Sequence, residues 1–441
     1  MSIKTHTYKN GFDVVYQKSP QSIPITSICI FCKVGAINEK DGQRGISHFV
    51  EHMCFKGTEK LRKTRNLYLE YNKVGAYFNA FTSKQLTGYI VKCGDEDVDH
   101  CISILEQTLL HSIFPKKEYE KEKHVVVEES IRLEDNSDHK MEVEIEKIYL
   151  KGSAYEHPID SIKYHKKHIS HDELCDWYDK YYVPGNMLLS IVSNLPFKSI
   201  MNCLDKTGFS HISSHMPFKS PSLTLEAISC KADKVRVEYI YKKGVTATTV
   251  TIGFRTCAYS SNDTYILHLI TSILNGFSGK LFTLLRSDKG LTYRSRCSLE
   301  SFEHTGYIIV YVQSDPTKLI HGQTSLQMGV VPTIVQLLNN MKHHGISQED
   351  LELAKAKIRG GMLRDLERID TLTQHNGIDR IMLNKIVPYD KLYPMFIAGI
   401  TKKDVNRVLQ KYFVRENMLV TVLHGKEIAK KHIESVCDQF Y

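Results

Sequence analysis

The chain has 441 residues and a mass of 50.6 kDa, which is more than one hydrophobic core usually organises, so we expect two domains, with three as the alternative. Its composition, 42% hydrophobic and 24% charged, excludes intrinsically disordered, collagen-like and low-complexity proteins. The net charge of +8 is modest and basic residues are mixed with acidic ones, so we expect no nucleic-acid partner. Because no apolar run approaches the roughly 18–20 residues of a membrane span, we also expect no membrane-spanning segment.

The amino-terminal segment and the cysteines bear on the cellular compartment. Residues 1–9 have neither an apolar core nor an arginine-rich amphipathic pattern, so we expect no signal or transit peptide and a cytoplasmic protein. The eleven cysteines are scattered, which favours free thiols in a reducing compartment. Cys29 and Cys32 are separated by two residues, but within a strand this spacing places them on opposite faces. A redox or zinc pair is therefore disfavoured.

Predicted strands and helices alternate along the first half of the chain. In chain order they are strand patterns at 11–17 and 25–34, a turn-rich segment at 38–45, a helical pattern from 46, a strand-rich stretch at 75–93, and helical patterns from 97 to 111 and from 116 towards 150. Residues 210–222 are rich in Ser, Pro and His and predict a linker. The predicted domains are therefore 1–212 and 223–441.

The two halves repeat sequence landmarks at nearly the same offset. Thr87-Gly-Tyr-Ile90 recurs 218 residues later as Thr305-Gly-Tyr-Ile308. The helical pattern that includes His48 has a counterpart at His268, 220 residues later. We interpret the repetition as a duplication, which predicts two similar tandem α+β domains.

The most informative segment is 45–57, which carries the pattern His-x-x-Glu-His at His48, Glu51 and His52. At about 100° per residue its apolar side chains form one narrow stripe, and the two histidines and the glutamate lie on the opposite side. Histidines at i and i+4 are about 6 Å apart and can bind one ion. The order is the inverse of the His-Glu-x-x-His arrangement of zinc peptidases. A solvated polar helix face is the alternative interpretation.

A catalytic zinc site needs a third protein ligand and one open position. The helical segment 116–133 offers Glu122 and Glu129, which are seven residues apart and project within about 20° of one another. One of them could bind the metal while the other supports a ligand through a hydrogen bond. Periodicity does not distinguish the two roles, and it leaves an ordinary charged helix face as the alternative.

The segment around the histidines resembles the signature of the pitrilysin/insulinase family of inverted zinc metallopeptidases, most closely its short, processing-peptidase-like members. The resemblance covers nearly the whole chain. Its parts are the run 34–58, the strand Asn79-Ala-Phe-Thr82, the glutamate helix at 122–129, the pair His157-Pro158, the strand entry Tyr181-Tyr-Val-Pro-Gly-Asn-Met187, and the element Leu285-Arg-Ser-Asp-Lys-Gly-Leu-Thr-Tyr293.

This resemblance implies a mechanism, a set of site residues and an assembly. Carried over position by position, it implies zinc on His48, His52 and Glu129, a general base at Glu51, a supporting glutamate at Glu122, and substrate binding by Asn79, Ala80, Arg286 and Tyr293. It further implies a mostly antiparallel sheet packed with helices in each domain, with the domains paired as a clamshell. The activity implied is that of a metalloendopeptidase that hydrolyses peptides or unfolded and presequence segments in an enclosed chamber. A homodimer is the expected assembly.

Two departures and two rival interpretations accompany the resemblance. Gln85 replaces the family's usual Glu, which removes a charge near the substrate strand, and Ser193 stands where Gly is common. The second half reads His268-Leu-Ile-Thr-Ser272 opposite the histidine motif, so we expect one zinc per chain. A non-catalytic core-type scaffold subunit of the same family is the alternative function. A nucleotide site at Gly276-Phe-Ser-Gly-Lys280 is excluded because it lacks the phosphate-loop spacing.

Overall fold

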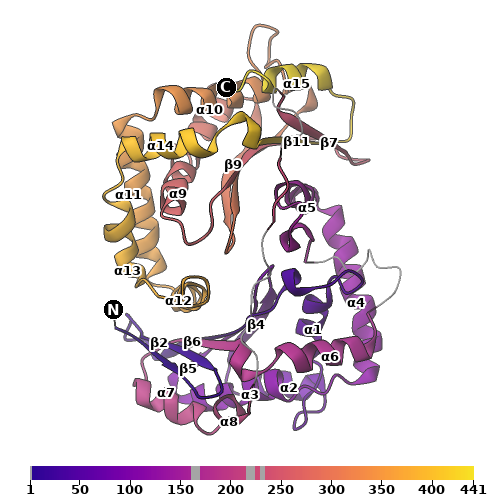
Figure 1. Cartoon of the computed structure of the whole chain (residues 1–441), viewed down its shortest axis with the longest axis vertical. Coiled ribbons are helices and arrows are strands. Elements are labelled where there is room, and N and C mark those ends of the chain that lie inside the picture. Colours follow the sequence, from indigo (N-terminus) through magenta and orange to yellow (C-terminus); the bar gives the residue numbers. More distant parts are fainter. Residues whose placement is uncertain (1, 160–168, 215–223, 229–233) are drawn as a thin grey trace. The chain divides into compact units, whose positions relative to one another are not determined.

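The computed structural model describes residues 2–159, 169–214, 224–228 and 234–441 (Figure 1). From residue 215 onward the predicted linker lies outside the described residues. The chain divides into two compact units, called unit 1 and unit 2 below, and each includes segments from both halves of the sequence. Unit 1 comprises Met1–Glu146, Gly152–Thr224 and Leu363–Asp390, and unit 2 comprises Lys147–Lys151, Leu225–Met362 and Lys391–Tyr441.

Unit 1 is built on a six-stranded sheet in the order β1-β2-β6-β3-β5-β4, so β1 and β4 are its edges. All neighbouring strands are antiparallel except β2 and β6, which are parallel. The strands are β1 (Ile3–Thr7), β2 (Asp13–Lys18), β3 (Ile25–Cys32), β4 (Tyr77–Thr82), β5 (Thr87–Gly94) and β6 (Met187–Ser193).

Helices cover one face of this sheet, and the main hydrophobic core of unit 1 lies between the helices and the sheet. They are α1 (Ile46–Cys54), α2 (Thr64–Lys73), α3 (Val98–Leu110), α4 (Lys116–Asp135), α6 (His171–Tyr181), α7 (Phe197–Leu204) and α8 (Gly208–His211). The helix α5 (Ser137–Tyr149) follows α4, and its last three residues belong to unit 2. Along β3, Ile30 and Cys32 face this core, whereas Cys29 and Phe31 face the opposite side of the sheet. Cys29 and Cys32 therefore lie on opposite faces, as their strand spacing predicts.

The opposite face of the sheet is covered by α12 (Ile369–Leu383), which comes from the second half of the sequence (Figure 1). Gly377 lies against the ring of Phe31, where a Cβ atom would overlap the aromatic carbons. Arg380 donates to Asp13 at 2.7 Å, and the amide of Asn376 donates to Gln17 at 2.8 Å. Unit 1 is therefore completed by a helix that lies far away in the sequence.

Unit 2 has a five-stranded sheet in the order β7-β11-β8-β10-β9. Its strands are β7 (Arg236–Tyr241), β8 (Thr248–Thr256), β9 (Thr292–Ser301), β10 (Gly306–Ser314) and β11 (Met418–His424). Its helices are α9 (Asp263–Leu274), α10 (Val330–His344), α11 (Gln348–Asp365, which ends in unit 1), α13 (Tyr389–Leu392, which begins in unit 1), α14 (Lys402–Tyr412) and α15 (Lys430–Cys437). Tyr149, at the end of α5, stacks on Tyr307 of this sheet with 5.3 Å between ring centroids.

The prediction of two similar domains is confirmed by the topology of the two sheets. The order β2-β6-β3-β5-β4 corresponds strand by strand to β7-β11-β8-β10-β9, and in both sheets only the first pair is parallel. Thr87 begins β5, and Thr305 directly precedes the equivalent strand β10. The expected α+β class, with two similar and mostly antiparallel sheets packed with helices, is therefore correct.

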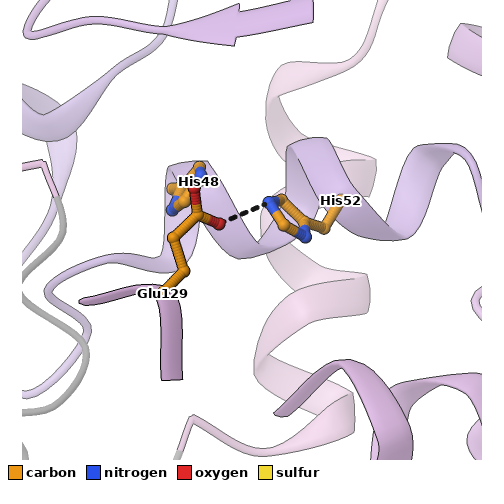
Figure 2. Close-up of side chains that lie close together, drawn as sticks. All are labelled: His48, His52 and Glu129. Carbon is orange, nitrogen blue, oxygen red and sulfur yellow. Dashed lines mark ion pairs between the residues drawn. The ribbon is translucent and has the colours of Figure 1, made fainter. Parts of the chain in front are cut away.

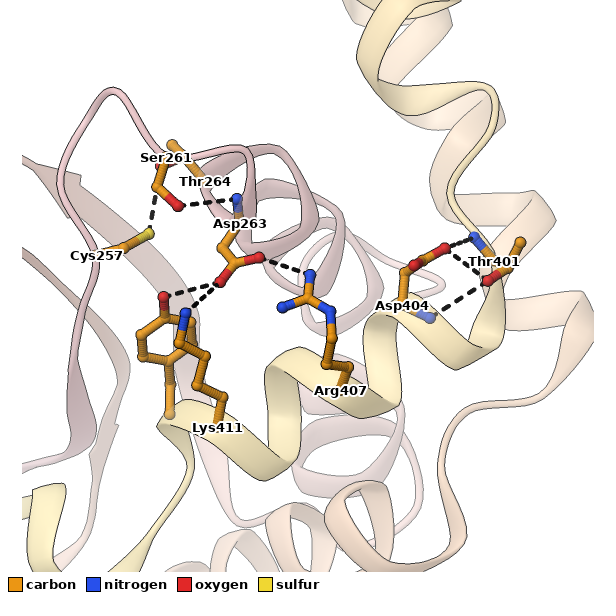
Figure 3. A network of polar contacts seen from close by, with 9 residues as sticks. Cys257, Ser261, Asp263, Thr264, Thr401, Asp404, Arg407 and Lys411 are labelled. Atoms are coloured by element: carbon orange, nitrogen blue, oxygen red, sulfur yellow. Dashed lines mark hydrogen bonds and ion pairs between the residues drawn. The ribbon is translucent and has the colours of Figure 1, made fainter.

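A buried carboxylate connects the first helix of unit 2 to α14 (Figure 3). Asp263, at the start of α9, accepts hydrogen bonds from Arg407 at 2.6 Å, Lys411 at 2.9 Å and Tyr412 at 2.9 Å. Thr401 caps α14 through a reciprocal pair of hydrogen bonds with Asp404. The three hydrogen bonds to Asp263 connect α14 to α9.

The structure differs from the sequence-based expectation at two elements of unit 1. The helical pattern from 116 towards 150 forms two helices, because Asn136 leaves the helical conformation and its side chain accepts the N–H groups of Asp138 and His139 at the start of α5. The edge strand β1 was not predicted, because Ile3–Thr7 carries only short alternation and is mostly exposed.

Candidate functional site

The first residues of α1 are held in place by local contacts, and these contacts fix the positions of its polar side chains. Gly45 precedes it with φ of +89°, a left-handed conformation that favours glycine. The carboxylate of Glu39 accepts the N–H of Gly45 at 2.8 Å and that of Ser47 at 3.0 Å, which satisfies two of the first free donors of the helix. Burial raises the pKa of Glu39 to about 7. The start of α1 is therefore anchored by an internal carboxyl group.

The apolar stripe of α1 anchors the rest of the helix. Ile46, Phe49, Val50 and Met53 are fully buried in the core of unit 1, as the helical wheel predicts. The histidines on the other side remain partly exposed and their rings lie 4.7 Å apart in an edge-on arrangement. The core thus fixes the direction in which the histidine motif projects.

His48 and His52 of α1 meet Glu129 of α4 in one cluster (Figure 2). One ligand atom from each of the three residues lies within 4.8 Å of the others, and this is the one such group among the described residues. Nε2 of His52 is 3.6 Å from Oε2 of Glu129. Zinc bonds of about 2.0–2.2 Å in a tetrahedral site place ligand atoms about 3.4 Å apart, so the cluster fits such an ion after small side-chain adjustments.

Glu122 occupies the other side of the His52 ring. Its Oε2 is 3.1 Å from Nδ1 of His52, and its Oε1 is 2.7 Å from the ammonium of Lys56. Burial alone would raise the pKa of Glu122, but the hydrogen bonds from His52 and Lys56 outweigh it and the pKa is lowered. Of the two glutamates, therefore, Glu129 lies beside the nitrogen that faces the cluster, and Glu122 lies beside the nitrogen that faces away from it.

Glu51 projects from α1 towards β4 and is 9% exposed. Its Oε2 accepts a hydrogen bond of 2.6 Å from the hydroxyl of Thr82, the last residue of β4. Burial raises the pKa of Glu51 above the usual value for a glutamate, although the Thr82 hydrogen bond opposes the shift. A buried carboxylate held in one orientation is suited to accept a proton.

The predicted substrate residues Asn79 and Ala80 lie on β4, an edge of the sheet. The side-chain amide of Asn79 donates to the hydroxyl of Tyr77 at 3.0 Å and accepts the N–H of Ala80 at 2.8 Å. Tyr77 and Asn79 are exposed. As an edge strand, β4 has main-chain groups that can pair with an added strand. The N–H of Ala80 becomes available for this when the Asn79 side chain releases it.

A cavity of about 310 Å³ joins this strand to the histidine motif. Its lining residues are Glu51, His52, Phe55, Lys56, Tyr68, Phe78, Asn79, Ala80, Glu122 and Val125. The ring of Phe78 lies 6.1 Å from that of Phe55 and 5.3 Å from that of Tyr68. Sequence reasoning missed these aromatic residues and Lys56. Phe55 and Lys56 could have been identified because they directly follow the motif. Tyr68 and Phe78 carried no such signal in the sequence.

Arg286 and Tyr293 are neighbours within unit 2. Arg286 lies in a π-helical turn, Phe282–Ser287, and its guanidinium group is stacked over Phe282 at 5.4 Å from the ring centroid. Its Nη1 donates to the backbone carbonyl of Tyr293 at 3.4 Å. Tyr293 is 91% exposed.

The counterpart of α1 in unit 2 has a different chemistry. At the position equivalent to His52, α9 carries Ser272, whose backbone carbonyl accepts a hydrogen bond of 2.6 Å from the ammonium of Lys357 on α11. The same ammonium donates to the carbonyl of Asn275 at 2.5 Å. A lysine in this place opposes the binding of a cation. Gln85 is buried in unit 1.

Comparison with known proteins places these features in context. Residues 13–160 match the family described as insulinase (peptidase family M16), and residues 168–358 match the one described as peptidase M16 inactive domain. A zinc protease of Bacillus subtilis is 27% identical over 95% of this chain and 98% of its own length. The beta subunit of the mitochondrial-processing peptidase of Neurospora crassa is 26% identical over 96% of this chain and 88% of its own.

The fold is shared with a solved protease of Helicobacter pylori, which has a TM-score of 0.85 and 21% identity over 96% of this chain and 99% of that one. Among the described residues, none of the helices combines the length and the apolarity needed to cross a membrane.

Proposed function

The chain belongs to the insulinase family of peptidases, family M16, and we propose that it is a zinc-dependent metalloendopeptidase that hydrolyses extended peptides or unfolded segments of proteins. The observation that carries the proposal is the convergence of His48, His52 and Glu129 beside the buried carboxylate of Glu51. In a chain without catalytic activity, no function would require these four groups to lie together.

His48, His52 and Glu129 would hold the zinc ion, with Glu122 fixing the ring of His52 through Nδ1. When bound, zinc polarises a carbonyl group and lowers the pKa of a coordinated water towards about 7. Two imidazoles and one carboxylate leave the open position that such chemistry requires. The lysine beside the equivalent position of unit 2 supports one zinc ion per chain.

Glu51 acts as the general base. Its carboxylate accepts a proton from the attacking water and returns it to the leaving amine. The hydrogen bond from Thr82 holds one oxygen of Glu51 in place and leaves the other oxygen available to accept the proton. Because Thr82 ends the edge strand β4, the base and the substrate strand are positioned by the same element.

The substrate binds along β4 as an added strand, with main-chain hydrogen bonds at Asn79 and Ala80. Main-chain recognition tolerates many sequences, which favours extended and unfolded substrates over folded ones. The cavity beside β4 accepts one substrate side chain against Phe55, Tyr68 and Phe78. A relative named as a processing peptidase supports a polypeptide substrate.

Arg286 and Tyr293 complete the site by binding the substrate and the developing negative charge on the carbonyl oxygen. We propose a homodimer in which these residues of one chain serve the metal site of the other. The name of the fungal relative, which is one subunit of a peptidase, supports an active form with more than one chain. Each chain carries both elements, so two identical chains suffice.

The experiment that tests the proposal combines metal analysis with a peptide assay. Purified protein should contain one zinc ion per chain by mass spectrometry and should cleave a quenched fluorescent peptide. Removal of the metal by a chelator should abolish cleavage, and added zinc should restore it. Zinc-free protein that neither binds zinc nor cleaves any peptide of a diverse library would favour the alternative, a core-type scaffold subunit of the same family.

A further inference from the structure

Lys56 lies outside the His-x-x-Glu-His motif, yet its ammonium group contacts the machinery of the metal site. It is 2.7 Å from Oε1 of Glu122, whose Oε2 is 3.1 Å from Nδ1 of His52. Nε2 of the same ring is 3.6 Å from Glu129. The four side chains thus form one continuous line of charge-assisted contacts, and Lys56 is at its outer end.

The two glutamates of α4 differ in how their oxygens are engaged. Both oxygens of Glu122 have short partners, one from Lys56 and one from His52. The contacts of Glu129 are longer, at 3.6 Å to His52 and 3.9 Å to Arg132, and the side chain of Arg132 is 78% exposed. Glu129 can therefore turn to a metal ion without breaking a strong hydrogen bond, whereas Glu122 cannot.

The position of Lys56 is fixed by its own surroundings. Its backbone N–H donates to the carbonyl of Met53 at 3.0 Å, and its carbonyl accepts the hydroxyl of Thr64 at 3.3 Å. The side chain is only 16% exposed. An ammonium held in this way immobilises the carboxylate of Glu122, which has several rotatable bonds and would otherwise have His52 as its one partner among the described residues.

We propose that Lys56 is a positioning residue of the metal site: it holds Glu122 so that Glu122 fixes the orientation and the tautomer of His52, leaving Glu129 as the carboxylate ligand. The proposal rests on the proposed zinc function. According to the proposal, Lys56 strengthens zinc binding through Glu122. Its positive charge alone would weaken zinc binding, because an ammonium group repels a nearby divalent cation.

The sign of the effect is therefore the test. Zinc affinity is measured on metal-free protein by competition with a chromophoric chelator. Lys56→Met should weaken zinc binding about tenfold or more, the range for loss of a partner behind a histidine ligand. Lys56→Arg, which keeps the charge and the donor, should restore most of the affinity. Lys121→Met is the matched control, since Lys121 precedes Glu122 on α4 but pairs with Glu118 at the surface, with its side chain 56% exposed.

A double-mutant cycle shows whether Lys56 acts through Glu122. In the Glu122→Gln background, Lys56→Met should have little further effect on zinc affinity. Unchanged or tighter zinc binding by Lys56→Met, or an equal loss in both backgrounds, would overturn the assignment. Failure of the proposed function is a different result, since the wild-type chain would then bind no zinc before any substitution is made.

Discussion

The hydroxyl of Thr82 donates a hydrogen bond of 2.6 Å to Oε2 of Glu51, which connects the end of the edge strand β4 to the middle of α1. The distance between the proposed base and the proposed substrate strand is therefore set by one direct contact. A peptide that pairs with β4 is placed in register with Glu51 by the same strand that orients the carboxylate.

Glu51→Gln should abolish peptide hydrolysis and leave zinc bound. The amide has the shape of the carboxylate but cannot accept the proton of the attacking water, and loss of a general base typically costs about 10²–10⁴-fold in rate. Turnover of the quenched peptide and zinc content are measured on the same preparation. Near-normal turnover would mean that a different group is the base.

Glu129 and its neighbour Glu128 provide a matched pair of variants on α4. Glu129→Gln should lose most of the bound zinc, because Glu129 belongs to the three-residue cluster. Glu128→Gln should keep the zinc, because Glu128 is exposed and lies about 100° away around the helix. Metal content after dialysis distinguishes them. Equal zinc retention by both would remove Glu129 from the ligand set.

The features that sequence reasoning predicted are those that depend on local periodicity. The apolar stripe of α1, with Phe49 and Met53, follows from a repeat of 3.6 residues, and the opposite orientations of Cys29 and Cys32 follow from a repeat of two. The seven-residue separation of Glu122 and Glu129 placed both on one face of α4. It could not assign each to a different nitrogen of His52, because that choice depends on tertiary packing.

Two features that depend on long-range packing were not predicted. The cover of the unit 1 sheet by α12 joins positions more than 300 residues apart, such as Asp13 and Arg380, and no local pattern reports such a contact. The aromatic residues that line the cavity were not predicted for the same reason. Tyr68 and Phe78 come from different elements, and their spacing in the sequence is that of ordinary core residues.

Gly377 tests the role of α12 in unit 1. Gly377→Ala should lower the free energy of unfolding by about 1–3 kcal/mol, because the added methyl group overlaps the ring of Phe31 and the helix must move off the sheet. Gly399→Ala is the control, since a Cβ at Gly399 meets no atom within 4 Å. Urea unfolding followed by circular dichroism measures both. Equal stability of the two variants would show that α12 is not tightly packed on this sheet.

Complementation tests the proposed sharing of sites between two chains. The inactive Glu51→Gln chain is mixed with the inactive Arg286→Ala/Tyr293→Phe chain under conditions that allow exchange. In a homodimer with shared sites, each mixed dimer has one site with all groups intact, so activity should return to roughly a quarter of wild type for random pairing. Absence of recovery despite verified exchange, or full activity of a monomer, would contradict sharing between chains. Arg286 and Tyr293 would then serve the metal site of their own chain or have no role in the reaction.

Asp263 should make the stability of unit 2 depend on acidic pH. Burial alone would raise the pKa of Asp263, but the hydrogen bonds from Arg407, Lys411 and Tyr412 outweigh it and lower the pKa to about 2. A carboxyl group whose pKa is lower in the folded state than its ordinary value of 3.8 stabilises the fold above that value, and this contribution is lost as the pH falls from about 4 towards 2.

Asp263→Asn should therefore reduce the free energy of unfolding by about 1.5–3 kcal/mol at pH 7, the range for hydrogen bonds to a charged group. The lower part of that range is expected, because Arg407 and Lys411 are half exposed and solvent weakens their attraction to the carboxylate. The difference from wild type should shrink as the pH falls below about 4, since the wild-type carboxylate then becomes protonated and loses its charge-assisted partners. Asp404→Asn, which alters the exposed cap of α14 and leaves the hydrogen bonds of Asp263 in place, should cost less and serves as the control. Urea unfolding at pH 7 and pH 3 measures both variants, and a difference for Asp263→Asn that is independent of pH would mean that shape rather than charge holds α14 against α9.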